Sequence, residues 1–125
     1  MLLFASSKET RVETAQSKIL IIDNYIDDSI FKMLQKKKNN VTVVALTSHN
    51  SKINKLDVKK FNEQYPVFKL AITNKFHDRF IIIDNKELYH CGASLKDLGK
   101  KCFAISKIED NEILKKINEN IFQYD

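Results

Sequence analysis

A histidine and an arginine lie two residues apart in this chain, at His77 and Arg79, just ahead of the apolar run 80–83. Such a run is typical of a β-strand, and side chains two residues apart on one strand share a face. A guanidinium can hold phosphate oxygens in a bidentate fork, and an imidazole can attack phosphorus or protonate a leaving oxygen. The pair therefore predicts phosphate chemistry at a strand spanning residues 76–83.

The surrounding pattern predicts one α/β domain over residues 1–125, with a mixed sheet. Apolar or β-branched runs predict further strands at 18–23, 41–46, 67–72, 87–89 and 102–105. Apolar residues at helical spacing predict helices that end near residue 16, near residues 36–38 and before Pro66. They predict a further helix that begins after a cap at Asp110. The order of the first two strands around a helix predicts a right-handed βαβ unit, and residues 85–86 predict a hairpin turn.

The composition favours a soluble protein with an anionic partner. Of the 125 residues, 43% are hydrophobic and 30% charged, and the net charge is +5. That excess favours nucleic acid first and an anionic membrane second, although scattered lysines that only maintain solubility are an alternative. The chain has no apolar run long enough for a membrane span or a signal peptide. Its abrupt apolar start also fits a domain excised from a longer chain.

Cys91 and Cys102 lack the spacing of metal ligands, and His90 beside Cys91 does not complete a zinc site. Free thiols in apolar surroundings are typical of a reducing compartment, which predicts a cytoplasmic protein without a metal.

The pattern His77-x-Arg79-x4-Asp84, followed by Gly-x-Ser at 92–94, resembles the HKD motif of the phospholipase D superfamily. That family's pattern is His-x-Lys-x4-Asp followed by Gly-Ser-x-Asn, after a similar strand–helix–strand unit. The resemblance implies a phospholipase D-like mixed β-sheet flanked by helices on both faces. The chain departs from the family with Arg79 in place of lysine, Lys96 in place of asparagine, and one additional residue between the two parts of the motif.

The resemblance implies roles for four candidate catalytic residues. His77 falls at the position of the nucleophile, Arg79 at that of the phosphate-binding lysine, and Ser94 at that of a further phosphate contact. Asp84 matches the motif aspartate. Its strand parity, opposite to that of His77, predicts that it supports either the structure or the residues that contact the substrate. No metal or cofactor is implied.

A group of lysines follows the motif turn and could track a nucleic-acid backbone. With Arg79 and Ser94, the candidate phosphate- or nucleic-acid-binding residues include Lys96, Lys100 and Lys101.

The chain contains one such motif, whereas active sites of this family contain two histidines. Single-motif members of the family pair two chains about a twofold axis, which implies a homodimer that joins two copies of His77. The first functional hypothesis is a metal-independent phosphodiesterase, a nuclease-like module of bacterial or phage type with an attached N-terminal DNA-binding domain. The alternative is a catalytically inactive module that binds DNA, phosphate or anionic lipid and mediates dimerisation, which the change to Arg79 favours.

Ordinary structural roles compete with these assignments. A strand histidine among apolar residues is commonly a hydrogen-bonded core residue, and His90 is expected to be structural. Residues 36–38, all lysines, are typical of a solvated helix end, and the stripe of the last helix fits core or dimer interface.

Overall fold

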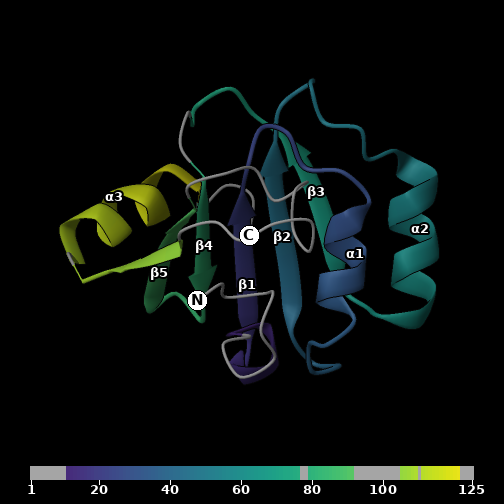
Figure 1. Ribbon diagram of the computed structural model, residues 1–125, viewed down its shortest axis with the longest axis horizontal. Coiled ribbons are helices and arrows are strands. Elements are labelled where there is room, and N and C mark those ends of the chain that lie inside the picture. Colours follow the sequence, from purple (N-terminus) through teal and green to yellow (C-terminus); the bar gives the residue numbers. More distant parts are fainter. Residues whose placement is uncertain (1–10, 77–78, 92–104, 110, 122–125) are drawn as a thin grey trace.

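The centre of the molecule is a six-stranded mixed sheet, seen in a computed structural model that describes residues 11–76, 79–91, 105–109 and 111–121 (Figure 1). The strands are β1 (Lys18–Ile22), β2 (Thr42–Thr47), β3 (Phe68–Ile72), β4 (Phe80–Ile83), β5 (Glu87–Cys91) and β6 (Ile105–Ile108). Their order across the sheet is β3-β2-β1-β4-β5-β6. β1, β2 and β3 run parallel, whereas β4, β5 and β6 join as an antiparallel meander. The predicted α/β class and βαβ unit are confirmed.

β1 lies at the middle of the sheet, between β2 and β4. Its residues 19–22 are at most 1% exposed, and Ile21 pairs with Ala45 on one side and Ile81 on the other. A strand packed on both faces reads as a continuous apolar run, because no side chain can point to water.

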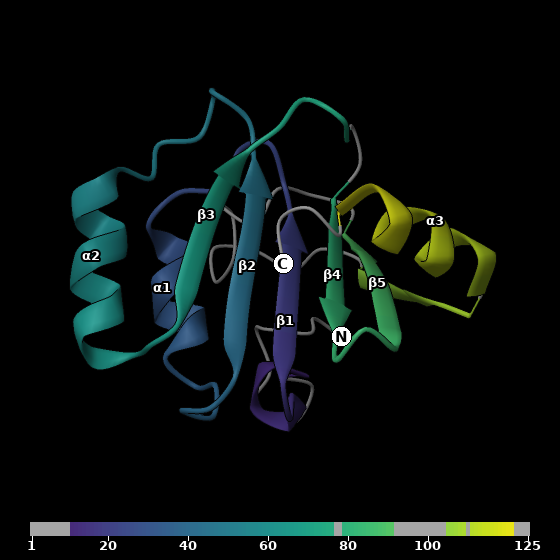
Figure 2. The same cartoon turned by 180° about the vertical axis from the view of Figure 1, so that it is seen from behind.

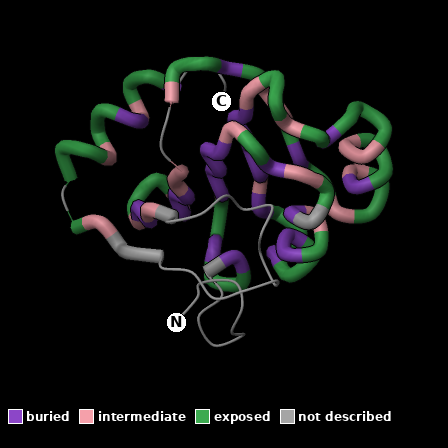
Figure 3. Tube along the Cα trace, turned by 45° about the horizontal axis from the view of Figure 1, so that its top comes forward, coloured by how far each residue is buried: buried purple, intermediate pink, exposed green. Residues whose placement is uncertain are grey.

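Helices cover both faces of this sheet (Figures 1 and 2). α1 (Ser29–Leu34) and α2 (Lys55–Gln64) lie on one face, and α3 (Asn111–Ile121) lies on the other. Alternate strand residues divide accordingly: Ile19 and Ile21 pack in the cluster under α1 and α2, whereas Leu20 and Ile22 pack in the cluster that includes Ile117 and Ile121 of α3. Figure 3 shows the buried residues concentrated along the strands and on the inner sides of the helices.

The predicted solvated helix end at residues 36–38 is wrong for its middle residue. α1 ends at Leu34, and Lys37 is 6% exposed, although its two neighbours are exposed. Its Nζ donates hydrogen bonds to the backbone oxygens of Pro66 (2.7 Å) and Lys38 (3.3 Å). Burial lowers the pKa of Lys37. Through its hydrogen bond to Pro66 O, Lys37 links the end of α1 to the chain ahead of β3.

Some boundaries of the predicted elements also change. β4 begins at Phe80, not at residue 76, so Arg79 precedes the strand. β6 lies further along the chain than the predicted 102–105, of which residues 102–104, like the cap Asp110, lie outside the described residues. The predicted first helix appears within the described residues as the short 3-10 turn η2 (Arg11–Thr14).

The β4–β5 turn is centred one residue earlier than predicted, on Asp84 and Asn85, at φ of 54° and 58°. Asp and Asn tolerate this left-handed region better than other residues with a Cβ. The turn closes with a hydrogen bond from Lys86 N to Ile83 O (3.0 Å).

The Asp84 carboxylate binds the chain that enters β1. Oδ1 accepts hydrogen bonds from the backbone N–H groups of Ser17 (2.7 Å) and Lys18 (3.0 Å) and from the Ser17 hydroxyl (3.0 Å), while Oδ2 accepts from Gln16 N (2.9 Å). Burial alone would raise the pKa of Asp84, but these donors outweigh it and lower the pKa from 3.8 to about 2. The carboxylate thus joins the β4–β5 turn to the start of the central strand.

We predict that Asp84→Asn lowers the free energy of unfolding at pH 7 by about 1 kcal/mol, after allowance for solvent screening of this partly exposed group. Because the folded pKa lies below the unfolded one, the carboxylate stabilises the fold fully above about pH 4 and progressively less as the pH falls to about 2. Urea unfolding between pH 2 and pH 7 should therefore show the variant and the wild type converging in acid. Asp28→Asn is the matched control, since the Asp28 side chain makes no capping hydrogen bond to α1. A constant difference across this pH range would contradict the assignment.

Candidate functional site

The carboxyl ends of β1, β2 and β3 meet at one edge of the sheet, and the start of β4 returns to that edge. Ile22, the last residue of β1, pairs with Phe80, the first residue of the antiparallel β4. Asp23 and Arg79 are therefore neighbours at the point where the sheet changes from parallel to antiparallel pairing. Open α/β sheets bind ligands outside the carboxyl ends of their strands, where the direction of the connections changes. This edge is the candidate functional site.

Arg79 and Asp23 form an ion pair at this edge. The distance from Arg79 Nε to Asp23 Oδ1 is 3.9 Å, and the two side chains are 33% and 0% exposed. Oδ1 also accepts a hydrogen bond from Tyr25 N (2.9 Å). Because Arg79 Nε itself is buried, other atoms of the side chain carry its exposure. Arg79 is thus anchored on its inner side by a buried carboxylate and remains accessible from solvent.

Asn24 links three segments at the same edge. Its Nδ2 donates a hydrogen bond to Phe76 O (2.9 Å), and its backbone oxygen accepts one from the Ser48 hydroxyl (2.7 Å). The connection that leads to Arg79 is therefore tied to the ends of both β1 and β2. Thr47 O accepts a hydrogen bond from Thr73 N (2.7 Å), which extends the links to the end of β3.

Buried polar atoms without a hydrogen-bond partner gather here. Within the part of the chain that the structure describes, such side-chain atoms are Asn24 Oδ1, Thr47 Oγ1 and Arg79 Nε. An unpaired buried polar atom costs about 1–3 kcal/mol, and native proteins keep few of them. Their gathering at one edge indicates that this region is not optimised for stability alone.

Sequence reasoning missed Asp23, Asn24 and Thr47 as parts of this site. The available signal was their position: polar residues directly follow, or end, two buried parallel strands of a βαβ unit. That signal predicts that these residues lie at the carboxyl edge of the sheet. It does not predict their contacts, because these depend on β4 pairing antiparallel to β1.

The structure places only some of the predicted site residues. Arg79 lies at the carboxyl edge, whereas Asp84 lies at the opposite end of β4, about 16 Å away for a strand rise of ~3.3 Å per residue. The remaining predicted site residues, which are His77, Ser94, Lys96, Lys100 and Lys101, lie outside the described residues. Their roles therefore stay predictions.

The strand face that His77 and Arg79 were expected to share is not part of β4, since Arg79 precedes the strand. Of the other histidines, His49 is exposed, and the His90 ring lies 5.4 Å from that of its cross-strand partner Phe80.

The described residues contain no cluster of three or more His, Cys, Asp or Glu side chains that could hold a metal ion. None of the helices in the described ranges is long and apolar enough to cross a bilayer.

Comparisons with known proteins identify the fold. No protein-family model and no curated protein matches the chain. Among solved structures, NucT from Helicobacter pylori superposes with a TM-score of 0.63 and 16% identity over 90% of this chain and 80% of NucT. TrmBL2, an archaeal chromatin protein described as showing a novel mode of DNA binding, superposes with a TM-score of 0.52 and 20% identity. That match covers 98% of this chain but 49% of TrmBL2, so the chain spans about half its length. At these identities the likeness concerns the fold alone, which is a mixed α/β sheet flanked by helices, similar to that of NucT.

Proposed function

We propose that this domain is a metal-independent phosphodiesterase that acts on nucleic acid through His77, in a site completed by a second copy of the chain. The observation that carries the proposal is the placement of Arg79, an accessible guanidinium at the carboxyl edge of a phospholipase D-like sheet. His77 precedes it by two residues in the sequence, and the proposal assigns the imidazole to the same site.

The proposed chemistry follows from these two groups. The His77 imidazole attacks phosphorus, an N–P bond forms, and the P–O bond to the leaving group breaks. The histidine of the second copy donates its proton to the leaving oxygen, then takes a proton from the water that cleaves the phosphohistidine. Arg79 holds non-bridging oxygens through both steps, with Ser94 as a further contact.

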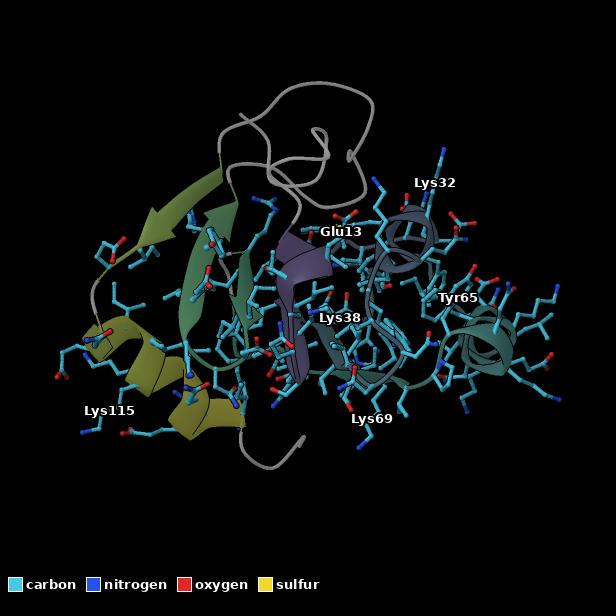
Figure 4. The ribbon with its side chains drawn as sticks, turned by 90° about the horizontal axis from the view of Figure 1, so that it is seen from below. Glu13, Lys32, Lys38, Tyr65, Lys69 and Lys115 are labelled. Carbon is cyan, nitrogen blue, oxygen red and sulfur yellow. The ribbon has the colours of Figure 1, made fainter. Side chains whose placement is uncertain are left out.

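A nucleic-acid substrate is favoured by charge and by the fold neighbours. Of the two, TrmBL2 is a chromatin protein described as showing a novel mode of DNA binding. This chain carries a net charge of +5. Its described lysines are spread over both faces of the molecule: Lys32 on α1 and Lys115 on α3 both point away from the sheet (Figure 4). Such a distribution supports general attraction to a polyanion, and specific phosphate contacts are assigned to the carboxyl edge.

One observation favours the alternative, a catalytically inactive module that binds DNA, phosphate or anionic lipid and mediates dimerisation. The Asp23 carboxylate lies 3.9 Å from Arg79 Nε, so a phosphate must share the guanidinium with a buried acidic side chain. A site of this kind can hold a phosphate without turning it over.

The first prediction for this function concerns plasmid nicking in the presence of a chelator. The wild-type chain should nick supercoiled plasmid DNA, and His77→Ala should reduce the rate at least about 100-fold, because it removes the nucleophile. Lys115→Ala, which removes one exposed charge from α3, is the matched control and should keep the wild-type rate within about twofold. Equal nicking by the wild type and His77→Ala would contradict the proposal, and DNA binding without nicking by either would favour the inactive module.

A second prediction tests whether two copies share the site. After subunit exchange, a ninefold excess of His77→Ala should reduce the rate per wild-type chain to about a tenth, because most wild-type chains then sit in mixed dimers with one histidine. Sedimentation of the same samples should show the dimer. An unchanged rate per wild-type chain, or a strict monomer that is fully active, would contradict a shared site.

A further inference from the structure

We propose that Asp23 and Asn24, the two residues that follow β1, are positioning residues that hold Phe76 and Arg79, the described residues on either side of 77–78, at the carboxyl edge of the sheet. The expected effect of these residues on catalysis rests on the proposed function. Their effect on the position of Phe76 and Arg79 does not depend on it. It concerns how the two sides of the segment that contains His77 are fixed.

Asn24 holds the near side of this segment. Its Nδ2 donates to the backbone oxygen of Phe76, the residue before His77, at 2.9 Å. The Phe76 ring packs against the cluster of Leu20, Ile22 and Leu46 under the α3 face. The chain that enters His77 is therefore fixed both through its backbone and through a side chain.

Asp23 holds the far side. Its backbone N donates to Leu46 O (3.0 Å), which continues the pairing of β1 and β2 by one residue and fixes the direction of the carboxylate. The carboxylate is fully buried, and its Oδ1 lies 3.9 Å from Arg79 Nε. A buried carboxylate favours a neighbouring guanidinium in this position, because separating the pair would remove a charge partner from a group that is out of water.

Adjacent side chains at the end of one strand therefore fix the residues on either side of 77–78. β1 is a rigid base for this purpose, since its residues 19–22 are at most 1% exposed and are paired on both edges. A displacement of about 1 Å in a reacting group can cost on the order of 100-fold in rate. Losing either contact should thus reduce turnover more than it reduces binding.

A purely structural role for these residues predicts a different result, and Asn62 provides the comparison. This α2 residue also holds backbone with its side-chain amide: its Nδ2 donates to Phe68 O (2.9 Å), and its Oδ1 accepts from Phe68 N (2.6 Å). Phe68 begins β3, at the amino end of the parallel strands, so Asn62 is remote from the carboxyl edge. Asn62→Ala removes a comparable structural contact without touching the proposed site.

The experiment compares Asp23→Asn, Asn24→Ala and Asn62→Ala in the full chain, with urea unfolding, steady-state phosphodiester cleavage and exchange of the Arg79 Nε proton by 15N NMR. Arg79→Lys identifies that NMR signal. We expect both site variants to lower kcat at least about tenfold while KM changes less than about threefold. Exchange of the Arg79 Nε proton should rise at least about tenfold in the same variants. Asn62→Ala should lower stability and leave kcat and the exchange rate unchanged.

The readouts separate this inference from the proposed function. Faster Arg79 exchange in the site variants, in a protein that cleaves no phosphodiester, would support the positioning and reject the phosphodiesterase. Unchanged Arg79 exchange in Asp23→Asn and Asn24→Ala would overturn the inference. In a chain that does cleave phosphodiesters, a loss of kcat no larger than that of Asn62→Ala would overturn it as well.

Discussion

The central strand β1 is enclosed on every side, and the rest of the structure depends on that constraint. Its backbone pairs with β2 and β4, and its side chains pack alternately under α1 and α2 or under α3. Burial of this kind stabilises each large aliphatic side chain by about 1.5–3 kcal/mol, and it leaves the strand little freedom to shift. The polar groups at its two ends therefore have fixed positions. The chain uses both ends, one to hold the β4–β5 turn and the other to hold the segment ahead of β4.

The two ends have different physical characters. At the amino end, Asp84 accepts several hydrogen bonds in a well-satisfied arrangement that lowers its pKa. At the carboxyl end, the side-chain atoms Asn24 Oδ1, Thr47 Oγ1 and Arg79 Nε are buried without a hydrogen-bond partner. Native proteins keep few such atoms, and a functional role is one reason for keeping them. This contrast supports the placement of function at the carboxyl edge.

Much of the fold could be predicted because the buried strands are recognisable in the sequence as apolar runs. The runs around β1 and β2 are apolar without interruption, which only strands covered on both faces require. The start of β4 could not be predicted in the same way, since Phe76 looks like a strand residue but is held by Asn24 from another part of the chain. The buried state of Lys37 escaped prediction for the same reason, because its acceptor, Pro66 O, is 29 residues away.

The candidate site was predicted less completely than the fold. Arg79 could be identified from its residue type and neighbours, whereas Asp23 and Asn24 looked like ordinary residues after a strand. Their importance depends on which strand lies beside β1, and pairing between distant segments is not visible in local pattern. The expectation that residues 77 and 79 share a face of β4 assumed a longer strand, whereas β4 begins after Arg79. The carboxyl edge itself follows from topology.

The carboxylate that joins the β4–β5 turn to the start of β1 also bears on how the chain folds. Its contacts with Gln16, Ser17 and Lys18 span 66 to 68 residues of sequence. Pairing of β1 with β2 closes a much shorter loop in the sequence. Pairing of β1 with β4 closes a loop that contains β2, α2 and β3. Chains dominated by such distant contacts fold more slowly than those dominated by local ones, because loop entropy is lost before the contacts form. The candidate site needs β1 and the approach to β4 together, so we expect it to form only when the two halves of the sheet join.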